Sequence, residues 1–188
     1  ALPSASMSWL PGSRTIIFTA DGFASATATV ALGVGMPGSI EASAGGDQSA
    51  TAGTAVPVPP AVLVKDDKGN PLPGVPVTFS VAAGGGQVSG AVPVTGANGV
   101  ATVGGWTLGP AAGANTLAAA ISGVNVSGSP VSFTATGTAG TVDAGKSTVS
   151  ADPATIPASG GSSPSTITVT ARDALGNPVS GLAVTLAA

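Results

Sequence analysis

The sequence contains no cysteine, no histidine and no tyrosine. Without cysteine it can form no disulfide, thiolate zinc site or iron–sulfur cluster. Without histidine it lacks the usual base of a Ser-His-Asp triad. Only 7% of its 188 residues are charged and the net charge is −3, so no basic surface for nucleic acid is expected. We therefore expect no enzyme, no cofactor and no nucleic-acid partner.

Long hydrophobic runs are also absent, although 43% of the residues are apolar. The longest uninterrupted run is 117–121, far below the ~20 residues of a membrane-spanning helix. Apolar residues instead alternate with Thr, Ser and Pro, as in Val75-Pro76-Val77-Thr78-Phe79 and in Ile167-Thr168-Val169. This period of two predicts strands that bury one face. The stretch 111–120 is interrupted by Gly113 and is interpreted as a loop followed by a strand, not as a helix.

A repeat organises the chain. Residues 65–79 recur without a gap as residues 172–186, an offset of 107 residues from Lys65 to Arg172. A weaker match relates Trp9-Leu10-Pro11-Gly12 to Trp106-Thr107-Leu108-Gly109. A module of ~100 residues has the usual size of a β-sandwich domain. We predict an all-β tandem of Ig-like Greek-key sandwiches, one complete and two partial, with boundaries at 1–35, 36–137 and 138–188 and short linkers near 33–38 and 136–140.

Turn residues separate the predicted strands. Gly69-Asn70-Pro71 and its repeat Gly176-Asn177-Pro178 combine a residue that tolerates φ > 0, one that hydrogen-bonds its own turn, and one that blocks further pairing. Asn98-Gly99 is typical of a two-residue type I′ hairpin loop. These residues are predicted to build structure and need no ligand to explain them.

The spaced elements together resemble a known family. Val64-Lys65-Asp66, Gly69-Asn70-Pro71, Gly74-Val75-Pro76-Val77, Gly84-Gly85-Gly86 and Asn98-Gly99-Val100-Ala101 resemble the bacterial Ig-like domain of the invasin/intimin type (Big-1). Residues from Thr148 to Gly181 look like the start of another copy. The resemblance implies tandem Ig-like sandwiches in a secreted or cell-surface bacterial protein, or in a phage virion protein. Most copies in such proteins act as spacers.

Three groups of residues are candidate sites, each with a structural alternative. Asp66 and Asp67, with Asp47 or Asn70, could offer oxygens to Ca²⁺, but the spacing is not that of an EF-hand and Asp67 becomes Ala174 in the repeat. A solvated turn explains them more simply. Trp9 and Trp106 could stack on sugars, although a core or junction anchor fits better. A Lys–Asn cross-link at Lys65 is disfavoured because the repeat has Arg172 there.

The leading functional prediction is therefore mechanical: a non-catalytic extracellular stalk or filament segment whose partners are neighbouring modules. The alternatives are an adhesive module for a host receptor or polysaccharide, an Ig-like domain of a phage virion protein, and an accessory module of a secreted enzyme. A further hypothesis is that residues 138–188 are completed by residues 1–35 of another copy, giving a head-to-tail polymer. The contrary interpretation is that the sequence is part of a longer chain.

Overall fold

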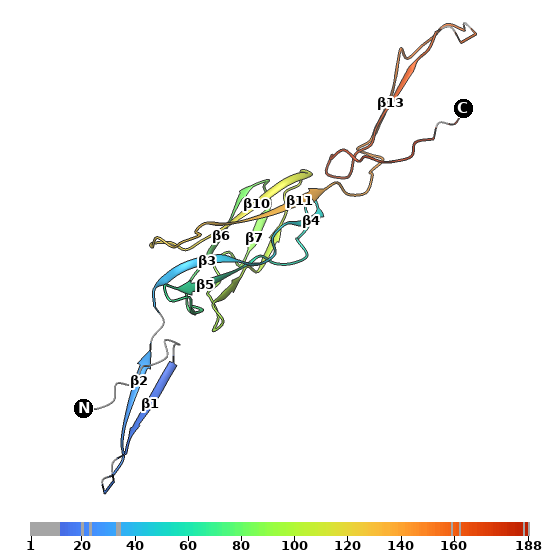
Figure 1. The fold of residues 1–188 in the computed structure, drawn as a ribbon. Helices are drawn as coiled ribbons and strands as arrows, with labels where there is room; N and C mark the ends of the chain where they lie inside the picture. The colour runs from blue at the N-terminus through green and yellow to red at the C-terminus, as the bar shows by residue number, and fades with distance from the viewer. Residues whose placement is uncertain are drawn as a thin grey trace.

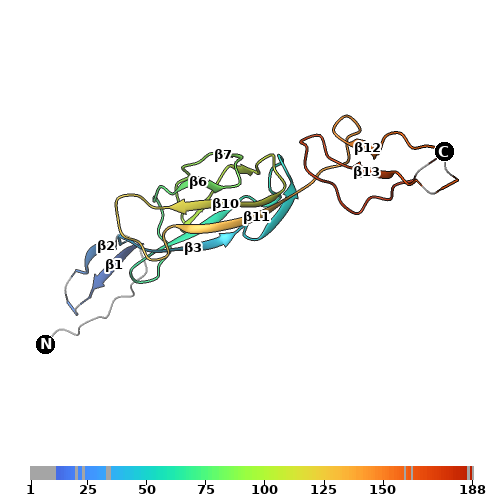
Figure 2. The ribbon, with the colours of Figure 1, turned by 90° about the horizontal axis from the view of Figure 1, so that it is seen from above.

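The computed structural model describes residues 12–19, 21–22, 24–32, 35–158, 160–161, 163–185 and 187. These residues form an elongated all-β chain in which a β-sandwich lies between two isolated hairpins (Figure 1). The view from above shows the same linear order (Figure 2). Within the described residues no helix is long and apolar enough to cross a membrane. The all-β prediction is confirmed.

Nine strands build the central part of the chain. They are β3 (Pro37–Ala44), β4 (Gln48–Thr51), β5 (Ala61–Asp66), β6 (Thr78–Ala83), β7 (Gln87–Ser89), β8 (Val100–Thr102), β9 (Gly105–Thr107), β10 (Gly113–Ala120) and β11 (Val131–Thr138). One sheet has the order β4–β11–β10–β6, a second has the order β3–β5–β8, and β7 pairs with β9. The stretch interpreted as loop then strand is indeed strand β10.

A single core joins the two sheets. Val62 and Val64 of β5 are fully buried, as are Leu117 of β10 and Phe133 of β11. Trp106, which the sequence analysis placed in a core or at a junction, is 0% exposed in the same cluster. Because successive residues of a strand point to opposite faces, the alternating pattern supplies one apolar face per sheet. Trp9 lies outside the described residues.

The sandwich is closed by a parallel pair. β4 lies near its beginning and β11 is its last strand, and they pair in parallel from Gln48 opposite Ala135 to Thr51 opposite Thr138. The Ala52 N–H extends the pair by donating to the Thr138 carbonyl at 2.8 Å. The remaining pairs between named strands are antiparallel. The two ends of the sandwich are therefore held together by main-chain hydrogen bonds.

One hairpin lies on each side of the sandwich. β1 (Gly12–Phe18) pairs with β2 (Ala26–Leu32) before it, and β12 (Thr148–Asp152) pairs with β13 (Thr166–Thr170) after it. The later hairpin repeats the first two long strands of the sandwich. Val149 lies opposite Val169, which under the 107-residue offset is the pair Ala42 opposite Val62. The repeat found in the sequence thus preserves strand register.

Two local predictions were wrong. Asn98 does not have the positive φ that a type I′ loop requires, since Asp47 is the only non-glycine residue with positive φ in the described part of the chain. Instead the Gly99 N–H bonds to the Gly96 carbonyl at 2.9 Å, and Gly99 itself takes φ +73°. The predicted linkers near 33–38 and 136–140 also overlap with strands, because β3 begins at Pro37 and β11 continues to Thr138.

Candidate functional site

The contact between the sandwich and the unit that follows it is the best-defined polar site of the molecule. It is built on a five-residue turn from Asp173 to Asn177, immediately after β13. The Asp173 carboxylate accepts hydrogen bonds from the N–H groups of Leu175 (3.0 Å) and Asn177 (2.8 Å). The Gly176 N–H donates to the Asp173 carbonyl at 2.9 Å. An Asp side chain that bonds the backbone of its own turn in this way fixes the turn.

The side chain of Asn177 connects the turn to the sandwich by hydrogen bonds. Its amide N–H₂ donates to the Pro110 carbonyl at 2.9 Å, and its oxygen accepts the Ala112 N–H at 2.8 Å. These partners lie 67 and 65 residues away in sequence, in the loop that leads into β10. One amide group therefore pairs with a donor and an acceptor of the same loop, which fixes its orientation.

Asp173 makes the second polar connection. Its other carboxylate oxygen accepts the Gly140 N–H at 2.8 Å, just beyond the end of β11, and also the Asn177 amide at 2.9 Å. Asp173 and Asn177 are only 2% and 7% exposed. Buried polar groups are stable only when they are hydrogen-bonded, and these two meet that condition by bonding each other and the sandwich.

The carboxylate of Asp173 is held in its charged form. The Asn177 amide makes the largest contribution, and the N–H groups of Gly140, Asn177 and Leu175 add to it. Removal from water opposes them, and the balance lowers the pKa of Asp173 from 3.8 to about 2. The contact is thus built around a carboxylate that stays ionised well below neutral pH.

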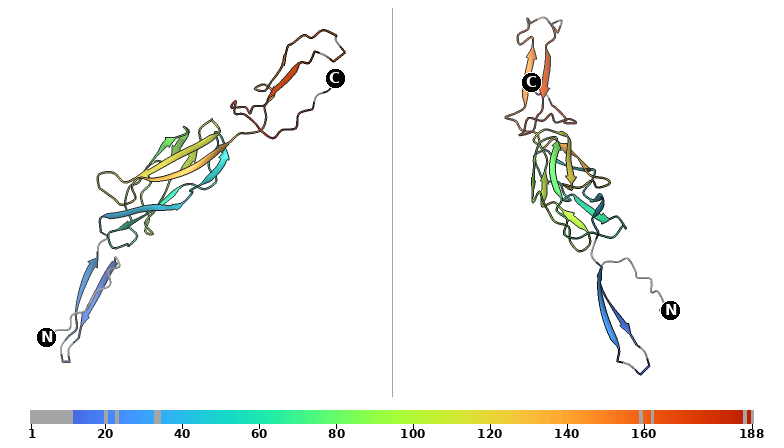
Figure 3. Two further views of the ribbon diagram at one scale, coloured as in Figure 1. Left: turned by 45° about the horizontal axis from the view of Figure 1, so that its top comes forward. Right: turned by 90° about the vertical axis from the view of Figure 1, so that its left-hand side faces the viewer.

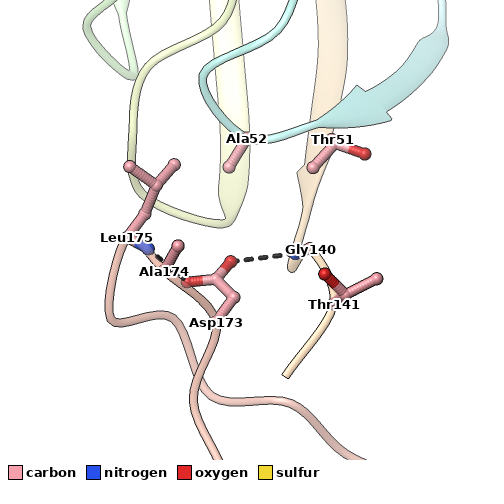
Figure 4. Close-up of a pocket in the computed structure, with 7 residues that line it drawn as sticks. All are labelled: Thr51, Ala52, Gly140, Thr141, Asp173, Ala174 and Leu175. Carbon is pink, nitrogen blue, oxygen red and sulfur yellow. Dashed lines mark hydrogen bonds between the residues drawn. The ribbon is translucent and has the colours of Figure 1, made fainter. Parts of the chain in front are cut away.

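Around the turn, apolar and small residues complete the contact. Figure 4 shows Thr51 and Ala52 of the sandwich facing Ala174 and Leu175 across a pocket of about 140 Å³, with Asp173 pointing to Gly140. The Leu175 methyl group lies 3.1 Å from the position that a Cβ on Gly53 would occupy, so this glycine allows close approach. A pocket of this size is below the ~300 Å³ of ordinary ligand sites. It is a seam between two units.

The same turn occurs 107 residues earlier, between Asp66 and Asn70. The Asp66 carboxylate accepts the N–H groups of Lys68 (2.9 Å) and Asn70 (2.8 Å), and the Asn70 amide donates to it at 3.0 Å. The Asn70 amide makes the largest contribution to lowering the pKa of Asp66. The Gly35 N–H, which precedes the sandwich, contributes as well. The turn therefore follows β5 in the sandwich and β13 in the later hairpin in the same way.

These contacts show where the predicted site residues lie. Gly69, Asn70, Gly176 and Asn177 form the two turns, and Pro71 and Pro178 follow them, bridged to Lys65 and Arg172. Asp66 uses its oxygens on N–H donors, whereas Asp67 is exposed with the Lys68 ammonium 3.6 Å away. Asp47 accepts a hydrogen bond from the Thr134 hydroxyl. Within the described ranges, no three Asp, Glu, His or Cys side chains gather as a metal site would require.

The contact of Asn177 with the sandwich does not follow from the sequence. Gly-Asn-Pro is predicted as a self-contained turn, because nothing local marks Pro110 or Ala112 as partners. The available signal was the repeated Asp-x-x-Gly-Asn spacing at Asp66 and Asp173. An aspartate that starts both copies of a turn, in a chain with so few charges, indicates a shared structural role.

Known proteins are similar to this chain in sequence and in fold. Residues 143–188 match the family described as invasin, domain 3. No curated protein matches the chain. The solved structure of the Escherichia coli adhesin FdeC is similar, with 22% identity over 92% of this chain and 54% of that one and a TM-score of 0.60. Here the likeness is one of fold, and the chain spans about half the length of that structure.

Two further solved structures are similar to this chain. Invasin, described as a bacterial integrin-binding protein, is 30% identical over 76% of this chain and 28% of its own, with a TM-score of 0.45. The D0–D1 part of intimin is 22% identical over 66% of this chain and 60% of its own, with a TM-score of 0.37. The resemblance to a bacterial Ig-like domain of the invasin/intimin type is confirmed by the match over residues 143–188 and by the fold.

Proposed function

We propose that this chain is a non-catalytic spacer in the stalk of a bacterial cell-surface adhesin, divided into units at 1–35, 36–137 and 138–188. The observation that carries the proposal is the double connection made by Asp173 and Asn177 to the sandwich. Two hydrogen bonds cross to the sandwich, between Asn177 and the loop residues Pro110 and Ala112. A third, from the Gly140 N–H to Asp173, holds the segment that leaves β11, so that one small turn is anchored both to the loop before β10 and to the connection between the units. Two points of attachment restrict both bending and rotation.

Repetition of the turn supports units that are stacked end to end in the same orientation. Asp66 binds the main chain before the sandwich, at Gly35, and Asp173 binds the main chain after it, at Gly140. Each unit thus uses the same turn to hold the segment that enters it. The extended arrangement in the ribbon views, with units in line, is what such a repeated connection produces (Figure 3). A spacer needs this property, because flexible joints would shorten its reach.

The strand pairing of the sandwich suits a load along the chain. Tension enters the sandwich through β3, which pairs with β5, and where it passes along the chain to β4 it pulls β4 and β11 in opposite directions along their length. Because the pair is parallel, its hydrogen bonds from Gln48–Ala135 to Thr51–Thr138 are sheared together and not opened one by one. Loading bonds together requires more force than breaking them in turn. This supports a mechanical role for the unit.

The comparisons support a surface location. The family matched by residues 143–188 is an invasin domain, and FdeC, whose fold is similar with a TM-score of 0.60, is an Escherichia coli adhesin. These are bacterial surface proteins, which favours that origin over a phage virion. We place the chain outside the cell, with a host receptor or polysaccharide as the target of the protein that it extends.

An adhesive role for the sandwich itself is the second candidate. It is favoured by a pocket of about 330 Å³ between residues 74–78 and the loop 121–124. Its wall includes Val75, Ile121 and Val124 and no charged side chain. The volume lies within the range of ligand sites, but such sites usually carry several convergent polar groups. Binding of a polysaccharide array to the isolated chain would favour this candidate.

The spacer proposal is tested by measuring how rigid the seam is. The chain has no native cysteine, so spin labels at Ser80→Cys in the sandwich and Thr168→Cys in β13 report one distance. Pulsed electron paramagnetic resonance should give a narrow distribution for the parent and a broad one for Asn177→Ala. Asn98→Ala is the matched control, because Asn98 bonds only within its own turn, to the Val100 N–H.

A second variant separates the seam from the turn. Ala112→Pro removes the N–H that donates to Asn177 and leaves the turn intact. It should also broaden the distribution. A narrow distribution in both Asn177→Ala and Ala112→Pro, or a broad one in the parent, would contradict the spacer proposal.

A further inference from the structure

The loop between β10 and β11 carries a sequence motif that the proposed function does not use. Asn125-Val126-Ser127 has the form Asn-x-Ser/Thr, in which x is not proline. This is the acceptor motif for sugars attached through the amide nitrogen of asparagine. It occurs once, because each of the other four asparagines has a residue other than Ser or Thr two positions later. A motif of three residues is short, so its structural setting decides its value.

The sandwich presents this motif to solvent. The loop lies at the end of the sandwich at which β3 begins (Figure 1, Figure 3). Asn125 and Ser127 are both exposed, whereas Val126 between them is 4% exposed and belongs to the core cluster. Because successive residues of extended backbone point to opposite sides, the acceptor amide and the hydroxyl share the outer side. Both groups that the motif requires are therefore accessible together.

Main-chain hydrogen bonds hold the motif in this orientation. The Ser127 N–H donates to the Gly38 carbonyl at 3.1 Å, and the Ser127 carbonyl accepts the Ile40 N–H at 2.9 Å. The Val126 carbonyl accepts the Ser129 N–H at 3.1 Å. These bonds fix the backbone against β3 through main-chain groups alone. The motif is thus displayed on a rigid support while its two polar side chains face outward.

Asn125 differs from the other asparagines in the availability of its amide group. The amides of Asn70 and Asn177 donate to the aspartates that begin their turns, and Asn115 is 1% exposed. Asn98 is exposed, but its amide oxygen accepts a main-chain N–H of its own turn. No residue in the described part of the chain hydrogen-bonds the Asn125 side chain. Exposure, motif and an uncommitted amide coincide at this asparagine.

We propose that Asn125 is the attachment site of an N-linked sugar. The donor is a sugar that carries a phosphate leaving group on its anomeric carbon, as nucleotide sugars and lipid-linked sugars both do, and a glycosyltransferase brings it to the motif. The amide nitrogen bonds to the anomeric carbon and loses one proton. The bond from that carbon to the phosphate oxygen breaks, and the phosphate leaves with the electron pair. Nothing is oxidised or reduced.

The surroundings of Asn125 suit a bulky hydrophilic group. Val124, the preceding residue, is 38% exposed and lines the pocket of about 330 Å³ together with Ile121. Only 7% of the residues of the chain are charged, against about 25% in ordinary soluble domains. A sugar on Asn125 would place a hydrated group beside an apolar part of the surface that few charges keep in water.

This inference goes beyond the spacer role and does not depend on it. Asn125 contributes no contact to the seam, which is made by Asp173 and Asn177. Rigid seams in a chain without the sugar would leave the spacer proposal intact and refute the attachment site. A sugar on Asn125 in a chain with flexible seams would do the reverse.

The first test is the mass of the protein isolated from the cells that produce it. Fragmentation in a mass spectrometer should locate a sugar on Asn125 and leave Asn98 unmodified, although Asn98 is also exposed. A single sugar would identify a nucleotide-sugar donor, and a longer oligosaccharide a lipid-linked donor. An unmodified Asn125 overturns the proposal.

The second test asks whether the folded chain is an acceptor. The purified chain is incubated with UDP-glucose and a soluble N-glucosyltransferase that modifies Asn-x-Ser/Thr sequences. One glucose should be added to the parent and to Ser127→Thr, which keeps the hydroxyl. Asn125→Gln and Ser127→Ala should abolish the addition. Both substituted side chains are exposed, and circular dichroism confirms that each variant is folded.

A synthetic peptide of residues 121–130 shows that the transferase is active. Glucose on the peptide but not on the folded chain overturns the proposal, because the sandwich would then hide the motif. Addition to Ser127→Ala at the parent level also overturns it, since the hydroxyl would then have no part in recognition. Addition to Asn98 as fast as to Asn125 would have the same meaning.

Discussion

Val62 and Val169 are the same residue at the same place in a repeat, yet one is 0% and the other 37% exposed. Each lies opposite the equivalent residue of its neighbouring strand, Ala42 or Val149. Strand and register are therefore set by features that both copies share. The two copies differ in burial, because burial requires a second sheet, and among the described residues only the sandwich has one. Local sequence therefore determines the strands and their register, and the sheet packed against them determines which residues are buried.

The largest difference between the two copies is expected when each valine is replaced by a charged residue. Val62→Asp should unfold the sandwich, with a loss above about 4 kcal/mol, because a carboxylate would be buried without a partner. Val169→Asp should change the unfolding free energy of the sandwich by less than about 0.5 kcal/mol, as exposed positions usually do. Chemical denaturation at low protein concentration measures both. Equal effects would show that the C-terminal hairpin is packed as tightly as the sandwich.

A second comparison concerns the glycines of two turns. Gly99 and Gly176 both have positive φ, at +73° and +87°. A Cβ on Gly99 would lie 2.7 Å from the Val64 carbonyl oxygen, whereas one on Gly176 would meet nothing within 4 Å. Gly176→Ala should therefore cost about 1–2 kcal/mol for its backbone conformation alone, and Gly99→Ala clearly more. Thermal unfolding of the two variants gives the order, and the reverse order would contradict the turn geometry.

The seam should respond to acid in a direction set by Asp173. Its folded pKa, about 2, lies below the ordinary 3.8. A lowered pKa contributes stability that is present above 3.8 and is lost as the pH falls through the folded value. The seam should thus be intact at pH 4 and loosen near pH 2. Carboxyl carbon shifts in nuclear magnetic resonance should give that midpoint, and Asp173→Asn should abolish the transition. A midpoint near 3.8 would mean that Asp173 is not held by the Asn177 amide and by the N–H groups of Gly140, Asn177 and Leu175.

The smallest effect is expected at the surface ion pair. The Lys65 ammonium lies 2.5 Å from the Glu41 carboxylate, with both side chains partly exposed. The equivalent positions after 107 residues are Arg172 and Thr148, which preserve no such pair. Lys65→Ala should lower stability by at most about 1 kcal/mol, and less at high salt. Denaturation at two salt concentrations checks this, and a loss of several kcal/mol would give the pair an unexpected role.

Sequence reasoning recovered the features that local pattern controls. Alternation predicted strands around residues 75–79 and 167–169, where β6 and β13 lie, and Gly-Asn-Pro predicted both turns. It missed β4, because Gln48–Thr51 has no apolar alternation and owes its place to pairing with β11. It missed the seam, because the partners of Asn177 are more than sixty residues away. It chose the wrong loop at Asn98-Gly99, since that dipeptide also fits a turn in which only Gly99 has positive φ.

The parallel pair of β4 and β11 has a consequence for how the molecule is made. The Thr138 hydroxyl bonds to the Ala50 carbonyl across 88 residues of sequence. During synthesis, β4 leaves the ribosome early, and it cannot pair with β11 until almost the whole sandwich has been made. Contacts of such long sequence separation slow folding. β11 is the last strand of the sandwich to be made, so the β4–β11 pair cannot form before the strands between them have been synthesised.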